Sequence, residues 1–294
     1  MATAGVDLDV EALLRLRLLV SSMRGARKPP RSTLPGAVLH QRRGRGLEVY
    51  DIRAWSDGDD IRHLDRNVTA RTGALHVRTF RDERERAVML VVDFRESMMF
   101  GTRRALRSVA GAEAIIALGW RTIEEGGSIG LLAATARGPC FIGRARGPRA
   151  MVSLIGELAA THRAAYEQPD LADPPLADVL AEAEGLAGES AIIVATALDA
   201  PGDGFDGVAE RLVRKRDLCV VLVADRFEID AMAGAYPYRT LDGDAGWLRV
   251  ERGAGAAAPD GRLARVRRLG GNFLQLDAAL DAEAMVSALE QLHG

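Results

Sequence analysis

The chain has 294 residues, enough for one large domain or for a domain with a substantial extension. Hydrophobic residues make up 48% and charged residues 27%, proportions that exclude a wholly disordered chain. The net charge of −2 excludes a global field that attracts nucleic acid. Charge is uneven along the chain, because residues 1–86 carry 17 Lys and Arg against 12 Asp and Glu, which makes this part basic and the remainder acidic.

The two cysteines, Cys140 and Cys219, both lie in apolar, strand-like runs. Neither belongs to a metal-ligand pattern, so we interpret them as buried structural thiols in a reducing compartment. The first residues lack the pattern of a signal peptide, and no apolar run approaches the ~20 residues of a membrane helix. We therefore expect a cytoplasmic protein that does not insert into a membrane.

The first part of the chain predicts an extension that precedes the main domain. Apolar residues at helical spacing predict a helix over 10–23, and a basic, proline-broken linker covers 25–35. Residues 38–50 read as irregular strand or loop, 57–60 as a turn or helix cap, and 75–80 as a strand.

From residue 87 onward, strands and helices alternate. The continuous apolar run over 87–93 predicts a strand that is buried on both faces of a parallel sheet. The further predicted elements are strands at 128–136, 139–143, 191–198, 218–224 and 272–276, helices at 102–125, 148–162, 176–186, 205–215, 262–269 and 281–292, and a hairpin over 236–251.

This alternation predicts an α/β fold with a doubly wound, mostly parallel, Rossmann-type sheet and an N-terminal extension. We expect three parts, which are an N-terminal helix and basic linker (1–36), a segment packed on the main domain (37–86) and the main domain itself (87–294). In such sheets, sites form where the strands end. Asp93, Thr196 and Asp225 close three of the predicted strands, so the loops that follow them are the first place to look for function.

The stretch Asp93-Phe94-Arg95-Glu96-Ser97 follows the first buried strand. An acidic residue that closes a strand and is followed by a hydroxyl resembles the von Willebrand factor A fold, whose metal-ion-dependent adhesion site has the pattern Asp-x-Ser-x-Ser. Oxygen ligands of this kind suit Mg²⁺.

A second group of motifs resembles the family catalogued as domain of unknown function 58 (DUF58). The matching stretches are Gly44–Arg53, Asp57–Asp65, Thr69–Gly73, Gly127–Gly130 and Asp225–Glu228. In that family a von Willebrand factor A-like domain follows the first three motifs directly. The resemblance, from about Gly44 to the C-terminus, implies a von Willebrand factor A-like fold over 87–294 and makes 37–86 the family's hallmark segment. It also implies an adaptor or co-chaperone associated with a MoxR-type AAA+ ATPase, and no established enzymatic reaction.

This sequence departs from the adhesion-site pattern at three positions. Arg95 replaces the middle serine, Pro174 or Pro175 stands in place of a threonine, and Thr196 stands in place of an aspartate. Asp199 is a candidate substitute for that aspartate, and Asp93 and Ser97 survive as metal ligands. A like charge about 4 Å from the ion would cost roughly 4 kcal/mol at an effective dielectric of 20.

Three interpretations of Arg95 are open. Its guanidinium replaces the ion and pairs with Asp93 or Glu96, or it points to solvent while Asp93 caps a loop, or Mg²⁺ still binds at a degenerate site.

The hallmark segment carries many charges. We interpret its charged side chains as a salt-bridged structural clasp on the main domain, because long irregular segments in compact proteins are uncommon unless functional. The alternative is a solvated surface, in which each ion pair contributes about 0–1 kcal/mol. The clasp residues are Arg53, Asp59, Arg62, Asp65 and Arg71.

The sequence thus predicts a non-catalytic, protein-binding adaptor without a cofactor, whose partner by resemblance is a MoxR-type ATPase. The predicted partner-binding residues are Asp93, Arg95, Glu96, Ser97, Thr196 and Asp199. One alternative is a Mg²⁺-dependent ligand-binding module. Another is an Asp-nucleophile phosphohydrolase, although Arg95 occupies the second position of its Asp-x-Asp motif. No phosphate-binding glycine loop and no nucleic-acid module are present in the sequence.

Overall fold

A computed structural model describes most of the chain in two compact units. One unit comprises residues 1–28 and 86–294, and the other comprises 29–85. The described residues are 5–26, 49–56, 59–80, 87–167, 173–188, 190–199, 201–229, 233–239, 244–251 and 261–290.

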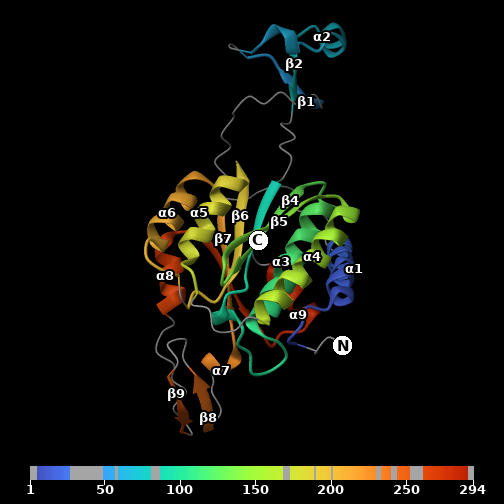
Figure 1. Cartoon of the computed structure of the whole chain (residues 1–294). Helices are drawn as coiled ribbons and strands as arrows, with labels where there is room; N and C mark the ends of the chain where they lie inside the picture. The colour runs from blue at the N-terminus through green and yellow to red at the C-terminus, as the bar shows by residue number, and fades with distance from the viewer. Residues whose placement is uncertain are drawn as a thin grey trace. The chain divides into compact units, whose positions relative to one another are not determined.

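A six-stranded sheet forms the centre of the larger unit (Figure 1). Its strands are β3 (Ala87–Asp93), β4 (Ser128–Thr135), β5 (Gly138–Arg146), β6 (Ala191–Thr196), β7 (Leu218–Ala224) and β10 (Asn272–Asp277). Their order is β10-β7-β6-β3-β4-β5, and all neighbours are parallel except β4 and β5. Because β3, the first strand of this sheet in chain order, lies inside the sheet and later strands extend to both sides, the sheet is doubly wound, which confirms the predicted fold class.

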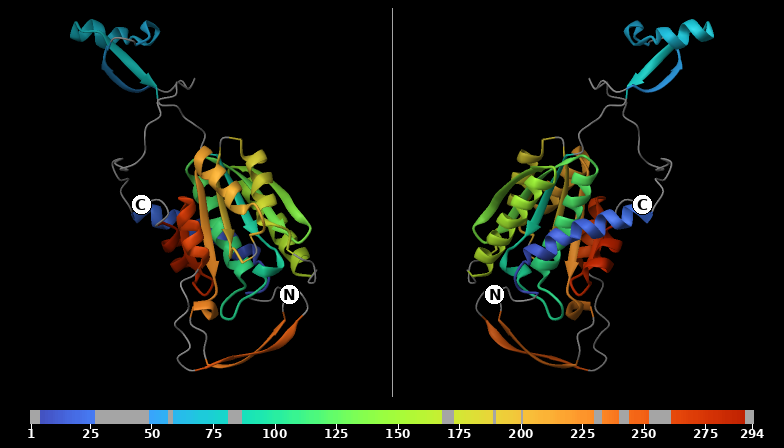
Figure 2. Two further views of the ribbon diagram at one scale, coloured as in Figure 1. Left: turned by 90° about the vertical axis from the view of Figure 1, so that its left-hand side faces the viewer. Right: turned by 90° about the vertical axis from the view of Figure 1, so that its right-hand side faces the viewer.

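Helices cover both faces of this sheet and enclose a core on each (Figures 1 and 2). On one face lie α1 (Val10–Ala26), α3 (Arg107–Glu124), α4 (Pro148–Tyr166) and α9 (Ala282–Leu289), and on the other lie α5 (Leu176–Ala187), α6 (Phe205–Lys215) and α8 (Gly261–Leu269). The strands between these layers are apolar on both faces, as their continuous hydrophobic runs predict.

Two short helices and a hairpin stand at the carboxyl ends of the strands. They are η2 (Glu96–Met98) after β3, α7 (Arg226–Ile229) after β7, and a hairpin of β8 (Gly234–Arg239) and β9 (Ala245–Val250). Among the helices that the structure describes, none is long and apolar enough to cross a membrane.

The N-terminal helix α1 packs into the larger unit. Leu13, Leu16 and Val20 are buried in its core. The indole Nε1 of Trp120 donates to the Leu13 carbonyl over 3.1 Å, and Arg17 forms an ion pair with Glu124 at 2.9 Å. The sequence predicted this helix as part of an extension that also holds the basic linker. In the structure the helix packs against α3, α4 and α9.

The predicted helix over 102–125 begins five residues later than expected, at Arg107. Thr102 instead donates its N–H to the Asp225 carboxylate over 2.9 Å. The N–H of Leu106 donates to the Gly5 carbonyl over 2.8 Å. These two bonds hold the preceding residues as a loop, because their donors are engaged with distant parts of the chain.

The described part of the smaller unit consists of an antiparallel pair of strands and two short helices. These are β1 (Val49–Ala54), η1 (Ile61–His63), α2 (Arg66–Thr72) and β2 (His76–Phe80). Asp65 caps α2 by accepting the N–H groups of Asn67 and Val68, and Gly73 ends the helix in the left-handed region. Of the residues in this unit whose exposure is described, only Asp65 and Val77 are buried.

The predicted clasp residues lie within this unit. Arg53 and Asp59 form an exposed ion pair with two hydrogen bonds, at 2.6 and 2.8 Å, and the hydrogen bond raises the pKa of Arg53. Asp65 acts as a helix cap, while Arg62 and Arg71 are exposed on η1 and α2. A clasp between the hallmark segment and the main domain stays a prediction. The predicted basic linker and the Gly44–Gly46 motif fall largely or wholly outside the described residues.

Candidate functional site

Asp93 and Arg95 form a buried ion pair at the end of β3. Neither residue exposes any surface to solvent. The Nε of Arg95 donates to Asp93 Oδ1 over 2.9 Å, and its Nη2 donates to Oδ2 over 2.7 Å. The main-chain N–H of Arg95 adds a third bond to Oδ1, over 3.1 Å. One arginine therefore contacts both carboxylate oxygens side-on, the strong geometry for such pairs.

Two other loops complete this site. The Thr196 hydroxyl, at the end of β6, donates to Asp93 Oδ2 over 2.7 Å. Nη1 of Arg95 donates to the Pro174 carbonyl, just before α5, over 2.9 Å. In the same segment, the Asp173 carboxylate accepts the N–H groups of Glu96 and Ser97, which begin η2. The positions that depart from the adhesion-site pattern thus meet at one ion pair, since Pro174 contacts Arg95 and Thr196 contacts Asp93.

The outcome for the three interpretations of Arg95 follows from this geometry. Burial acts to lower the pKa of Arg95, but the hydrogen bond and charge of Asp93 outweigh it and raise that pKa. The pairing of Arg95 with Asp93 is confirmed. The interpretation in which Arg95 points to solvent is wrong, because the strand end is enclosed and a guanidinium there has a carboxylate within reach.

A divalent cation does not fit these residues. An ionised carboxylate has about four lone-pair sites, and Asp93 already accepts four hydrogen bonds, three from Arg95 and one from Thr196. The guanidinium also places positive charge within 2.7 Å of the oxygen that would bind the ion. In the described part of the chain, no three His, Cys, Asp or Glu side chains gather as a metal site.

The six predicted partner-binding residues fall into two groups. Asp93, Arg95 and Thr196 are completely buried, so direct contact between them and a partner is not possible in this conformation. That part of the prediction is corrected, because the ion pair turns these side chains inward. Glu96 and Ser97 are half-buried and Asp199 is exposed, so these three remain accessible.

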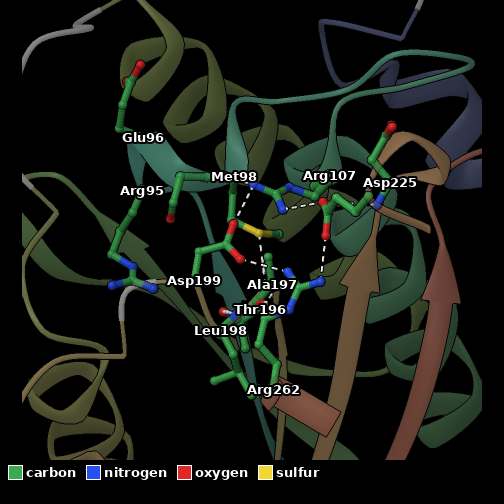
Figure 3. A network of polar contacts seen from close by, with 12 residues as sticks. Arg95, Glu96, Met98, Arg107, Thr196, Ala197, Leu198, Asp199, Asp225 and Arg262 are labelled. Atoms are coloured by element: carbon green, nitrogen blue, oxygen red, sulfur yellow. Dashed lines mark hydrogen bonds and ion pairs between the residues drawn. The ribbon is translucent and has the colours of Figure 1, made fainter. Parts of the chain in front are cut away.

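A ring of two arginines and two carboxylates lies beside the ion pair, and Figure 3 shows Arg95 directed away from it. Arg107 contacts Asp199 at 2.7 Å and Glu228 at 2.6 Å. Arg262 contacts the same two carboxylates, at 2.7 and 2.6 Å. This arginine–carboxylate ring (Arg107, Asp199, Arg262 and Glu228) joins the start of α3, the loop after β6, α7 and α8.

The ring was missed by reasoning from the sequence, because its members are separated by up to 155 positions, from Arg107 to Arg262. The signal that could have found part of it is the family-like Asp225-Arg226-Phe227-Glu228 stretch. Asp225 accepts the N–H and hydroxyl of Thr102, and Glu228 enters the ring. This short motif after β7 thus holds the loop before α3 through Asp225 and joins the arginine–carboxylate ring through Glu228.

A buried Ser108–His162 pair was also missed. The Ser108 hydroxyl lies 2.9 Å from His162 Nε2, and both residues are fully enclosed between α3 and α4. Burial lowers the pKa of His162 to about 4, although the charge of Asp7 acts in the opposite direction. The pair resembles a nucleophile and base, but without access for a substrate it serves packing. The signal was a histidine on the apolar face of a predicted helix.

Curated relatives share part of this chain. Uncharacterized protein Mb1516 of Mycobacterium bovis and uncharacterized protein Rv1480 of Mycobacterium tuberculosis are each 34% identical to it over 130 residues. That match covers 40% of this chain and 41% of each relative, so the chain spans less than half the length of these relatives.

Two solved structures are similar to this chain at low identity. The SpRpn10 VWA domain matches with a TM-score of 0.46 and 11% identity, over 70% of this chain and 94% of that one. The conserved hypothetical protein BatB from Bacteroides thetaiotaomicron matches with a TM-score of 0.46 and 14% identity, over 70% of this chain and 98% of that one.

A family assignment rests on the longest match. The sequence model described as "Protein of unknown function DUF58" matches residues 51–244, which is more than half of the 294-residue chain. This match includes β3 with Asp93 and Arg95, and it confirms the resemblance drawn from the motifs. The chain therefore belongs to the DUF58 family.

Proposed function

We propose that this chain is a non-catalytic adaptor that binds a protein partner through the loops above Asp93, without a metal ion, and that the partner is a MoxR-type AAA+ ATPase. The observation that carries the proposal is the buried pair of Asp93 and Arg95. An ion in such a site would draw three loops together, and here the Asp93–Arg95 pair does so, since Arg95 donates to the Pro174 carbonyl and Asp93 accepts from the Thr196 hydroxyl. The surface is therefore formed before a partner arrives, which lowers the ordering cost of binding.

The accessible part of this surface is polar and carries acidic groups. Glu96 and Ser97 stand on η2, which Asp173 holds from the neighbouring segment. Asp199 stands on the loop after β6 and is fixed by Arg107 and Arg262. The main chain of η2 and the side chain of Asp199 are thus held in place and lose little freedom on binding, which suits this surface to recognise basic or hydrogen-bonding groups of a partner.

Catalysis by Asp93 is not supported. A carboxylate nucleophile must reach the atom that it attacks, and Asp93 is completely enclosed. It is also engaged by Arg95 on both oxygens. The choice of a MoxR-type ATPase rests on the family resemblance alone, and the metal-free mode of binding rests on the site.

The test is calorimetric titration of the whole chain with the purified MoxR-type ATPase from the same genome. We expect saturable binding whose Kd is the same with Mg²⁺ and with excess EDTA. Glu96→Lys should weaken binding at least tenfold, because it reverses a charge on the accessible surface. Glu210→Lys, on the exposed face of α6, is the matched control and should leave the Kd unchanged.

Two outcomes contradict the proposal. Absence of binding to the ATPase removes the proposed partner. Binding that EDTA abolishes and Mg²⁺ restores, under nucleotide-free conditions, removes the metal-free mechanism and returns the function to a metal-dependent module.

A further inference from the structure

The hairpin of β8 and β9 carries three large apolar side chains that are largely exposed to solvent. Trp247 is 68% exposed, and Tyr238 and Leu248 are each 47% exposed. Figure 2 shows the hairpin extending from the larger unit. Its root is anchored, since the ring of Tyr236 packs edge-on against Phe227 with centroids 4.6 Å apart.

Apolar side chains stand on both faces of this two-stranded ribbon. The register pairs Tyr236 with Leu248 and Pro237 with Trp247, so the first pair lies on one face and the second on the other. A two-stranded hairpin is marginally stable by itself. Within the described residues β8 and β9 pair only with each other, so each strand has an outer edge with unpaired backbone groups.

Proline makes these two edges unequal. Pro237 has no N–H, so the hydrogen bonds of the ladder fall on the flanking pairs, Tyr236 with Leu248 and Tyr238 with Gly246. Pro237 then stands at a position whose backbone groups point outward, and the outer edge of β8 lacks its central donor. On β9 the residues whose backbone groups point outward, away from β8, are Ala245, Trp247 and Arg249, and all three have an N–H. The β9 edge is therefore the one open to another strand.

The sequence of β9 complements itself when it is reversed about Trp247. In an antiparallel pairing centred there, Ala245 of one copy faces Arg249 of the other, and Gly246 faces Leu248. Every large side chain except the central tryptophan then meets a small one, and the two Trp247 side chains meet on one face as an aromatic cross-strand pair. The outward-pointing residues of the two copies also face each other, as the hydrogen bonds require.

Charge favours the same arrangement. Arg249 lies near the end of β9, and Asp244 immediately precedes its start. The antiparallel pairing places the basic end of one strand beside the acidic start of the other, whereas a parallel pairing would set arginine against arginine. A standard stable interface buries about 800 Å² on each partner, more than one edge of a six-residue strand provides. The expected dimer is therefore weak and depends on concentration.

We infer that β9 pairs with β9 of a second copy of this chain, antiparallel and centred on Trp247, so that two hairpins form one four-stranded sheet. The contact is isologous, since the same surface serves on both subunits. It is independent of the partner proposed above, because the second copy binds the hairpin edge and not the loops above Asp93.

The first test is sedimentation velocity of the full chain over a range of concentrations. We expect a monomer–dimer equilibrium with a micromolar Kd. Arg249→Pro removes an outward N–H and should weaken the dimer at least tenfold, while leaving the hairpin's own ladder intact. Arg249→Ala is the matched control, because it loses the same charge and keeps the N–H, and it should weaken the dimer much less than Arg249→Pro does.

The second test places a cysteine on the proposed axis, in a background that carries Cys140→Ser. The prediction that Cys140 is buried is wrong, since its thiol is exposed and could form disulfides of its own. Trp247→Cys should form an intermolecular disulfide, because hydrogen-bonded antiparallel pairs have Cα atoms about 5.5 Å apart. Leu248→Cys is the control, since its mate would lie about 7–8 Å away on the diagonal. A monomer at all concentrations, equal effects of the two Arg249 variants, or faster cross-linking at 248 would each overturn the inference.

Discussion

At the scale of single residues, Arg95 has the largest effect on the site. A buried carboxylate at the end of a central strand needs a counter-charge, and the residue two positions along the chain supplies it. Because both charges are enclosed, their pairing is no measure of net stabilisation. Removing one of the two charges, however, leaves the other buried without a partner.

Arg95→Met should lower the free energy of unfolding by about 3–5 kcal/mol, because it leaves the Asp93 carboxylate uncompensated. The double variant Asp93→Asn with Arg95→Met removes both charges and keeps a hydrogen-bonding group for Thr196. We expect it to be more stable than Arg95→Met alone, as measured by urea unfolding. If the loss of unfolding free energy in the double variant equals the sum of the losses in Arg95→Met and in Asp93→Asn, the two side chains do not act as a coupled pair.

His162 makes the stability of the larger unit depend on pH. Its pKa is about 4 in the folded chain and about 6.5 when unfolded. Between these values the unfolded chain binds more protons, so stability falls as the pH falls. From pH 7 to pH 5 this group should cost ~2 kcal/mol.

The check is urea unfolding of the wild type and of His162→Gln at both pH values. Glutamine does not titrate but can still hydrogen-bond to Ser108. The wild type should lose about 2 kcal/mol more than the variant over this interval. Identical losses in the wild type and the variant would mean that His162 has the same pKa in the folded and in the unfolded chain.

At the scale of elements, hydrophobic periodicity predicted the strands and helices that are buried. The strands at Ala87–Asp93 and Leu218–Ala224 and the helix at Phe205–Lys215 have the bounds read from the sequence. Each carries a continuous or helical apolar pattern between clear end signals, so local and tertiary preferences agree. The α2 helix was not predicted, because it is short and exposed and is defined mainly by the Asp65 cap.

The polar contacts of the site were only partly predictable. Pairing between Arg95 and Asp93 could be anticipated, because the two residues are two positions apart at a strand end. The arginine–carboxylate ring could not, since it depends on where α8 and the loop after β6 meet. Those contacts depend on tertiary packing, which a local pattern does not encode.

The α1 helix allows an element-level prediction with an internal control. Leu13 is 1% exposed and Leu18 is 70% exposed on the same helix. Leu13→Ala should lower the free energy of unfolding by about 2–5 kcal/mol, because it opens a cavity in the core that α1 shares with α3. Leu18→Ala should change it by less than about 0.5 kcal/mol. Similar effects of the two variants, measured by chemical denaturation, would show that α1 is not part of the core.

At the scale of the whole molecule, the two units differ in how they are stabilised. The larger unit encloses a core on each face of its sheet. In the smaller unit, the only buried residues among those whose exposure is described are one aspartate and one valine. So little apolar burial is not expected to maintain a fold of this size alone. Sequence motifs identified this segment as a family feature, but hydrophobic patterning could not reveal how it is stabilised.

The packing of α1 also bears on how the chain is made. This helix leaves the ribosome before α3, α4 and α9, the helices that cover its apolar face. Until they appear, Leu13, Leu16 and Val20 have no native partners. Closure of this core is therefore a long-range event that is completed only when α9 is made, and the apolar face of α1 stays partly uncovered until then.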